Sequence, residues 1–169
     1  EVALNANIIK KADFNLDLGI FASFLKNELR DFPFPLPTGE INGQGLSGAF
    51  VQRIISGQPL NVFYVRQFEG IDKTNGQAIL TDDGASFFYK GDPNPRTLLG
   101  FSASATYKRL FLEINMNGAF GFQIYNNTAN AVLPINNLGT GRNTTPQTLA
   151  LDENLSSPIT TSSRYLENG

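Results

Sequence analysis

The first stretch whose spacing could carry chemistry is Gly43-Gln44-Gly45-Leu46-Ser47-Gly48, which matches the spacing of a dinucleotide-binding fingerprint. In that fingerprint, backbone amides at the start of a helix hold a pyrophosphate, and a buried strand must come immediately before the first glycine. Pro33, Pro35 and Pro37 occupy that place here, and prolines argue against a central strand. A plain glycine-rich loop is therefore the better interpretation.

Ser23 and Lys26 have the Ser-x-x-Lys spacing that brings an amine onto a hydroxyl one helical turn away, as in Ser/Lys acyltransferases. The companion signatures of those enzymes are missing, since Lys73-Thr74-Asn75-Gly76 departs from Lys-Thr-Gly. We interpret the pair as ordinary polar residues on the surface of a helix.

Two carboxylate doublets, Asp82-Asp83 and Asp152-Glu153, are candidates for an acid–base pair. Neighbours on a strand point to opposite faces, so neither doublet forms an acid–base pair by itself.

The run from Asp72 to Gly76 is similar to a calcium loop, but Gly76 stands at the fifth position, where an oxygen ligand belongs, and Gln77 at the sixth, where glycine belongs. This run predicts a hairpin turn.

The composition removes whole classes of chemistry. Among 169 residues there is no His and no Cys, which excludes an imidazole general base, a thiolate nucleophile, a zinc knuckle and an iron–sulfur cluster. General acid–base work would need carboxylates placed by the fold alone. The sequence thus predicts a protein that is not an enzyme, with no catalytic, cofactor-binding or metal-binding residues.

Charge and hydropathy exclude two kinds of partner. The net charge is −2, the isoelectric point is near 5.1, and the basic residues are scattered, so we expect no nucleic acid. No apolar run approaches the roughly 18 residues of a membrane-spanning helix, so we expect no membrane span. The chain begins with Glu1 rather than Met, which leaves open whether an upstream segment was cleaved.

The fold class follows from turn residues and alternation. Asn occurs 18 times, Gly 16 times and Phe 14 times, which is typical of many tight turns around an aromatic core. Strands are expected at 60–68, 77–81, 85–89 and 98–107, where apolar and polar residues alternate. We therefore expect a mainly β protein, an antiparallel sandwich or jelly-roll-like barrel with extended terminal arms.

One helix is expected near the N-terminus. Leu18, Phe21, Ala22, Leu25 and Leu29 form a helical stripe, which predicts an amphipathic helix over about 17–31, capped by Asp17. The three prolines that follow end it and form an extended strap. Before the helix, alternation from Val2 to Ile9 predicts one or two strands or an arm.

A hairpin is expected between Leu110 and Tyr125. A three-residue loop at 116–118 with Gly118 left-handed would pair Ile114 with Phe120 and keep the apolar side chains on one face. A two-residue turn at Asn117-Gly118 would split the apolar set between the two faces.

The domain organisation changes after Tyr125. Residues 1–125 are expected to form the β-rich core with its N-terminal arm and helix. Residues 126–169 are rich in Asn, Thr, Ser and Leu and poor in aromatics, which predicts an extended polar C-terminal arm that drapes over a surface. A flexible tail is the alternative.

These features predict a structural subunit of a protein assembly. In general style, though in no motif, the chain resembles the virion proteins of bacteriophages, and this resemblance implies a capsid, spike or tail component. Such a subunit would assemble with copies of itself and other structural proteins through strand addition and arm exchange. The alternative is a secreted or cell-surface binding or filament module. The expected location is the virion, or otherwise the extracellular space or cell surface.

Overall fold

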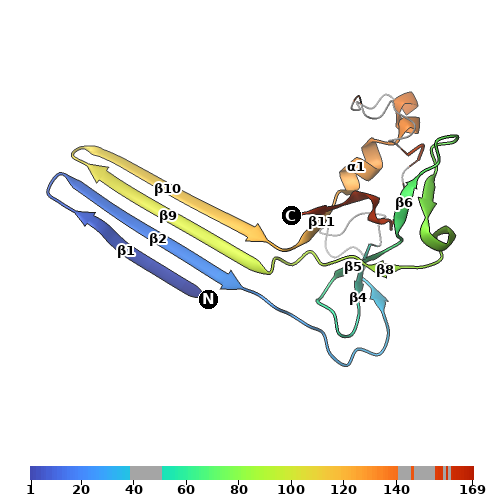
Figure 1. Cartoon of the computed structure of the whole chain (residues 1–169), viewed down its shortest axis with the longest axis horizontal. Helices are drawn as coiled ribbons and strands as arrows, with labels where there is room; N and C mark the ends of the chain where they lie inside the picture. Colours follow the sequence, from blue (N-terminus) through green and yellow to red (C-terminus); the bar gives the residue numbers. More distant parts are fainter. Residues whose placement is uncertain (39–50, 141–145, 147–154, 158, 160) are drawn as a thin grey trace. The chain divides into compact units, whose positions relative to one another are not determined.

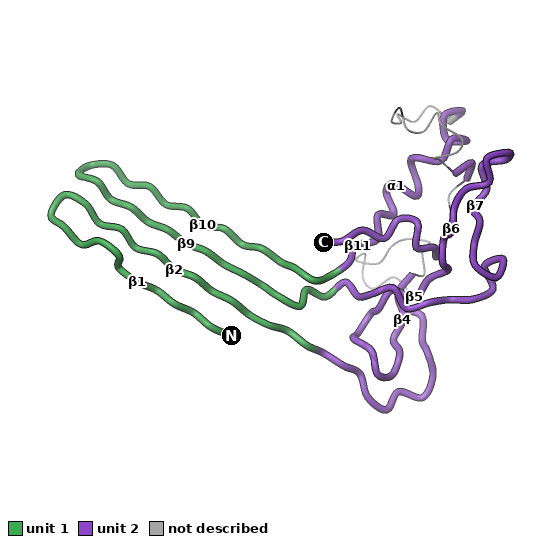
Figure 2. The backbone as a smooth tube through the Cα atoms, viewed as in Figure 1, with its two compact units in different colours: residues 1–26, 94–122, 169 green, residues 27–93, 123–168 purple. Residues whose placement is uncertain are grey.

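The computed structural model describes residues 1–38, 51–140, 146, 155–157, 159 and 161–169, which fold mainly into antiparallel β-strands with one short α-helix (Figure 1). The mainly β, antiparallel fold class is thereby confirmed. The glycine-rich run 43–48 and the doublet Asp152-Glu153 lie outside the described residues. The chain divides into two compact units (Figure 2): unit 1 comprises residues 1–26, 94–122 and 169, and unit 2 comprises residues 27–93 and 123–168.

Unit 1 is built on one four-stranded antiparallel sheet with the order β1-β2-β9-β10. The strands are long, namely β1 (Val2–Lys10), β2 (Phe14–Phe24), β9 (Thr97–Tyr107) and β10 (Leu110–Phe120). Two tight hairpins join β1 to β2 and β9 to β10, and β2 pairs with β9 across 72 intervening residues. A register shift between Asn7 and Ile9 marks a bulge in β1.

The amphipathic helix expected over about 17–31 is wrong. Phe14–Phe24 is the strand β2, and residues 25–30 form no helix. The segment carries a period of two as well as the helical stripe, because Leu16, Leu18, Ile20 and Ala22 alternate. Pairing with β1 on one side and β9 on the other selects the strand, since long-range hydrogen bonding overrides local propensity.

The hairpin expected within Leu110–Tyr125 is also wrong. Asn117 and Gly118 lie inside the continuous strand β10, and the turn falls earlier, at Lys108 and Arg109, between β9 and β10. Lys108 adopts a left-handed conformation with φ of 53°, which a two-residue hairpin turn requires. This turn has neither Gly nor Asn, so the sequence carries no ordinary signal for it.

Unit 2 contains three small antiparallel sheets. The first has the order β3-β4-β5-β8, from Leu36–Pro37, Gln52–Ile54, Val62–Val65 and Phe88–Tyr89. The second pairs β6 (Phe68–Ile71) with β7 (Ala78–Leu80), and the third pairs β11 (Gln123–Tyr125) with β12 (Leu166–Asn168). Three of the four strands expected from alternation, 60–68, 77–81 and 85–89, contain a shorter observed strand of unit 2, and the fourth, 98–107, lies within β9 of unit 1.

The helical elements of unit 2 are short. Among the described residues they are α1 (Asn127–Val132) and the 3-10 turns η1 (Thr81–Gly84), η2 (Ile135–Thr140) and η4 (Ser163–Tyr165). The side chain of Asn126 caps α1 by accepting a hydrogen bond from the backbone N–H of Ala129 at 2.9 Å. Where it is described, the stretch 126–169 thus differs from the extended arm that its composition predicts, because it forms a helix, turns and a paired strand.

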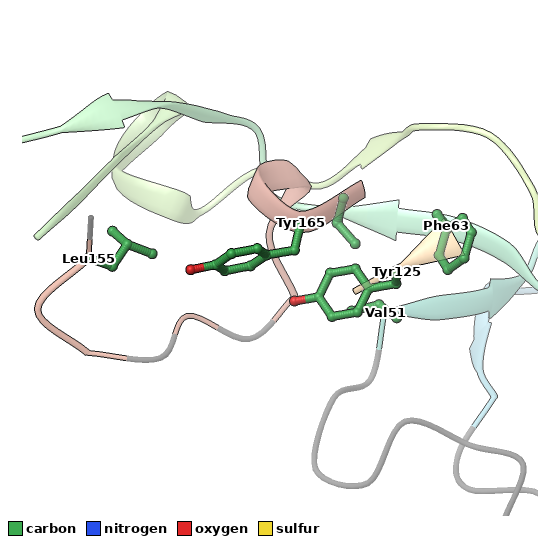
Figure 3. Close-up of a cluster of buried hydrophobic side chains, with 6 residues drawn as sticks. Val51, Phe63, Tyr125, Leu155 and Tyr165 are labelled. Carbon is green, nitrogen blue, oxygen red and sulfur yellow. The ribbon is translucent and has the colours of Figure 1, made fainter. Parts of the chain in front are cut away.

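A small hydrophobic core holds unit 2 together (Figure 3). It gathers side chains from distant parts of the sequence, namely Val51, Phe63, Val65, Tyr125, Leu155 and Tyr165. Leu155 and Tyr165 come from the stretch expected to be polar, and Leu155 is only 1% exposed. Burial raises the pKa of Tyr125 to about 12 and also raises the pKa of Tyr165.

Candidate binding surfaces

The sheet of unit 1 has two chemically different faces, because successive side chains on a strand point to opposite sides. The register aligns the alternation of all four strands. On one face, here called the apolar face, all side chains except Thr97 and Gly118 are hydrophobic: Val2, Leu4, Ala6, Ile9, Phe14, Leu16, Leu18, Ile20, Ala22, Phe24, Leu99, Phe101, Ala103, Ala105, Tyr107, Leu110, Leu112, Ile114, Met116 and Phe120.

The apolar face is open in the described structure. Val2 is 64% exposed, Leu110 is 72% exposed and Met116 is 59% exposed. Water-soluble monomers rarely expose a contiguous apolar patch of more than a few hundred Å². An exposed apolar face of this extent is typical of a surface that contacts another protein or a membrane.

The opposite face, here called the polar face, carries amides, hydroxyls and carboxylates in its middle rows. These side chains are Asn5, Asn7, Asp17, Ser102, Ser104, Glu113, Asn115 and Asn117. The Asn7 amide donates a hydrogen bond to Asp17 Oδ1 at 2.7 Å, and the Asn115 amide donates one to Glu113 Oε1 at 2.9 Å. These bonds orient the side chains and leave amide and hydroxyl groups facing outward.

Gly19 lies at the centre of two shallow, open depressions on the polar face, with volumes of about 390 and 470 Å³. Both depressions are lined by Asn5, Gly19, Ser102 and Asn115. A β carbon at Gly19 would lie 2.6 Å from Asn5 Oδ1, so the ends of the Asn5 and Ser102 side chains would have to move to make room for it. Glycine at this position thus lets the side chains of the two neighbouring strands lie over β2.

The polar face is suited to hydrogen bonding with an extended polypeptide. Asn, Ser and carboxylate groups offer alternating donors and acceptors that match the N–H and C=O groups of an extended polypeptide. Asp17 of β2 and Glu113 of β10 both pair with Ser104 of β9, which lies between them. Their Cα atoms are therefore two strand spacings apart, about 10 Å. No local motif marks these two carboxylates, because the register of non-adjacent strands brings them together.

The structure separates Ser23 from Lys26. Ser23 is on β2, is 2% exposed, and donates a hydrogen bond to Glu1 Oε1 at 3.5 Å. Lys26 follows the end of β2, so the helical spacing that would place its amine on the hydroxyl does not exist. Asp82 and Asp83 lie in η1, where the Asp82 carboxylate accepts a hydrogen bond from the Ser86 hydroxyl.

The hairpin turn expected at Asp72–Gly76 is confirmed, and it joins β6 to β7. The Gly76 N–H donates to the Asp72 carbonyl oxygen at 2.7 Å. The Asp72 carboxylate accepts hydrogen bonds from the Thr74 backbone and hydroxyl and from the Asn75 amide. The bonds from Thr74 lower the pKa of Asp72 below its usual value.

No group of three or more Asp or Glu side chains that could hold a metal ion occurs in the described ranges. Among the helices described here, none has the length and apolar character needed to cross a membrane.

No protein-family model and no curated protein matches the chain. Its fold is similar to chains in two solved structures: the RagAB peptide transporter (TM-score 0.69, 18% identity) and the RagAB peptide importer in the "closed-closed" state (TM-score 0.68, 20% identity). Each match covers 98% of this chain but only 20% of the other. The chain therefore shares its fold with about one fifth of a chain in each of these peptide transporters.

Proposed function

We propose that this chain is part of a cell-surface module that binds peptides and helps to import them. The observation that carries the proposal is the four-stranded sheet of unit 1, which has a continuous apolar face and a polar face hollowed at Gly19. Such a sheet separates two media, one apolar and one aqueous. Similarity to chains of the RagAB peptide transporter, over nearly the whole of this chain, supports the same assignment.

The apolar face contacts lipid acyl chains in this proposal, which departs from the expectation of no membrane span because that expectation considered helices alone. Protein–protein interfaces usually mix polar and apolar groups, whereas this face carries one threonine and one tyrosine hydroxyl over four strands. The strands have 9 to 11 residues, which is the length that a tilted strand needs to cross the apolar layer of a bilayer. Aromatic rings lie at both ends of the face, with Phe14 and Tyr107 at one end and Phe24 and Phe120 at the other, as at membrane interfaces.

The outer edges of β1 and β10 must then be hydrogen-bonded to further strands. In a lipid environment an unpaired backbone N–H or C=O costs several kcal/mol. In the described residues, β1 pairs only with β2 and β10 only with β9. We propose that other parts of the transporter supply these neighbours, which is the strand addition already expected from the sequence.

The polar face lines the aqueous side and takes extended peptides. Amide side chains hydrogen-bond to peptide groups whatever the peptide's sequence, so Asn5, Asn115 and Ser102 around Gly19 suit a carrier of mixed peptides. Asp17 and Glu113 add negative charge to this side and favour peptides that are not acidic.

The virion subunit predicted from the sequence stays a prediction, and the similarity to peptide transporters favours the cell-surface alternative. A sandwich or jelly-roll arrangement would need a second sheet over the apolar face. That face is exposed in the described residues, so such a sheet would have to come from outside them. The experiment below separates the two functions.

The absence of native cysteine allows single labels to be placed on neighbouring residues of β10. Ile114→Cys puts an environment-sensitive fluorophore on the apolar face, and Asn115→Cys puts one on the polar face. The labelled chain, together with the other parts of the transporter that supply the neighbours of β1 and β10, is reconstituted in phospholipid vesicles with quencher-bearing lipids and is then titrated with a mixture of short peptides. We expect the lipid quencher to affect the label at 114, and the peptides to change the emission of the label at 115.

Equal quenching of both labels would contradict the two-sided arrangement. Quenching at 114 without a peptide response at 115 would leave a membrane protein with no role in peptide binding. Particles of regular symmetry that protect the label at 114 without lipid would instead favour the virion subunit.

A further inference from the structure

The side chains of Arg53 and Arg66 meet at one aromatic ring in unit 2. The Arg53 guanidinium carbon lies 4.6 Å from the centre of the Phe87 ring and 5.0 Å from that of Tyr64. The Arg66 guanidinium carbon lies 5.3 Å from the centre of the Phe87 ring. Both guanidinium groups are thus within about 10 Å of each other, the sum of 4.6 and 5.3 Å.

The local sheet places this group, here called the arginine–aromatic cluster (Arg53, Tyr64, Arg66 and Phe87), on one side of unit 2. Arg53 is the register partner of Val62 in β5, so it shares a face with Tyr64, two residues further along β5. The intervening residue Phe63 points to the other side, into the core. The rings of Tyr64 and Phe87 stack at 6.2 Å with an angle of 11° between their planes.

The two arginines have no acidic partner among the residues that the structure describes. Within that set, the recorded salt bridge joins Arg30 to Glu28. The neighbouring acids Glu69 and Asp82 instead accept hydrogen bonds from the hydroxyls of Thr81 and Ser86. Two guanidinium groups within about 10 Å of each other, with no acidic partner among the described residues, form a positively charged site that attracts an anion.

In the part of the chain that the structure describes, each of the two guanidinium groups has a hydrogen-bond donor without a partner. Nε of Arg53 and Nε of Arg66 are buried and have no hydrogen-bond partner in the described residues. An arginine stacked on a ring is fixed in orientation and still presents its planar N–H fork to a carboxylate. All four side chains of the cluster are partly exposed, so a ligand can reach them.

We propose that the arginine–aromatic cluster binds a carboxylate group of a peptide, with the Tyr64 and Phe87 rings contacting the adjoining apolar side chain. This assignment rests on the proposed function in peptide import and deepens it, because it names the group that is recognised. The carboxylate is either the C-terminus of the peptide or an Asp or Glu side chain. The chemistry is the same in both cases, so the test includes both.

The test uses NMR titration of the full chain in detergent micelles, following the Nε–H signals of the arginines. Four probes are compared: acetate, inorganic phosphate, a short neutral peptide with a free C-terminus, and the same peptide with an amidated C-terminus. A fifth probe, the amidated peptide with one Glu, separates the side-chain source from the terminal source. We expect acetate and the free peptide to shift the Arg53 and Arg66 signals, and the amidated neutral peptide to shift neither.

Arg53→Gln and Arg66→Gln should each weaken binding of the free peptide by about tenfold to a hundredfold, the usual effect of losing a charge-assisted hydrogen bond. Arg30→Gln is the matched control, because it removes the same charge from an exposed side chain of the same unit that is paired with Glu28. This variant should bind the peptide as the unchanged chain does. Arg53→Lys keeps the charge but lacks the planar fork, so it should recover only part of the affinity.

Several outcomes would overturn the inference. Equal affinity for the free and amidated peptides, unchanged by Arg53→Gln, would leave peptide binding in place and exclude this cluster as its carboxylate site. Preference for phosphate over acetate would replace the peptide assignment by a general oxyanion site. Acetate binding at the cluster with no peptide binding anywhere would contradict the proposed function instead, so the two failures can be told apart.

Discussion

Ser102 of β9 is the register partner of Gly19 in β2, and its hydroxyl occupies the space that a β carbon at Gly19 would need. The Asn5 side chain closes in from the other neighbouring strand. The polar face thus owes its depressions to a glycine in the middle of a long strand, a position at which glycine is otherwise unfavourable.

Gly19→Ala should therefore destabilise unit 1. The new methyl group displaces the ends of the Asn5 and Ser102 side chains, which can rotate away, so the cost should lie at the lower end of the about 1–3 kcal/mol of core overpacking. The loss can be measured by denaturant unfolding of the chain in detergent micelles. Gly70→Ala is the control, because a β carbon at Gly70 meets no atom within 4 Å. Equal effects of the two substitutions would refute the close contact at Gly19.

Ile114 and Asn115 are adjacent in β10 but lie on opposite faces of the sheet, so they provide a paired test of the lipid-facing surface. Ile114→Arg should reduce the stability of the chain in phospholipid vesicles by about 2–4 kcal/mol, the cost of a charge near the middle of the bilayer. Asn115→Arg should cost less than 1 kcal/mol, because its side chain faces water. The readout is the midpoint of denaturant unfolding in vesicles, and similar costs for both variants would argue against lipid contact.

The sequence predicts the β class and the strand 98–107 well, because strict alternation is a local signal. It mispredicts β2, because Leu18, Phe21 and Ala22 fit a helix as well as a strand, and only pairing with β1 and β9 decides between them. It also mispredicts the turn after β9. Asn117-Gly118 is the stronger turn signal, yet the chain turns at Lys108 and Arg109.

The candidate surfaces are even harder to predict than the strands. Asp17 and Glu113 share a row of the polar face only because β2 and β10 both pair with β9. Arg53, Arg66 and Phe87 likewise meet through the local sheet and loops of unit 2, with no common spacing in the sequence. Recognition of the apolar face requires the register of four strands, whereas a single strand shows only ordinary alternation.

The turn at Asp72 gives a pH-dependent prediction. Hydrogen bonds from Thr74 lower the pKa of Asp72 below 3.8, so the ionised turn is favoured above that pH, and its stabilisation is lost as the pH falls through the lowered pKa. The Thr74 amide, which donates to Asp72 Oδ1 at 2.8 Å, should report the transition as a change in its NMR chemical shift. Asp72→Asn should abolish this acid transition, and a midpoint above 3.8 in the unchanged chain would contradict the account.

The buried tyrosines of unit 2 give the opposite pH dependence. Burial raises the pKa of Tyr125 to about 12, whereas an unfolded chain ionises near 10. The neutral phenol therefore stabilises the fold fully below pH 10, and this contribution is lost as the pH rises from about 10 to about 12. When the phenolate absorbance of the five tyrosines is followed with rising pH, Tyr125 should ionise at a higher pH than a tyrosine of the unfolded chain.

Tyr125→Phe should remove part of this late phase and make the alkaline fall in stability less steep. The hydrogen bond from the Tyr125 hydroxyl to the Ile159 carbonyl oxygen is long, at 3.4 Å, so its loss should cost little at neutral pH. Tyr107→Phe is the matched control, because Tyr107 is 52% exposed. If every tyrosine of the folded chain ionised together near pH 10, the core packing around Tyr125 and Tyr165 would be refuted, since burial in that core is the main cause that raises the pKa of both.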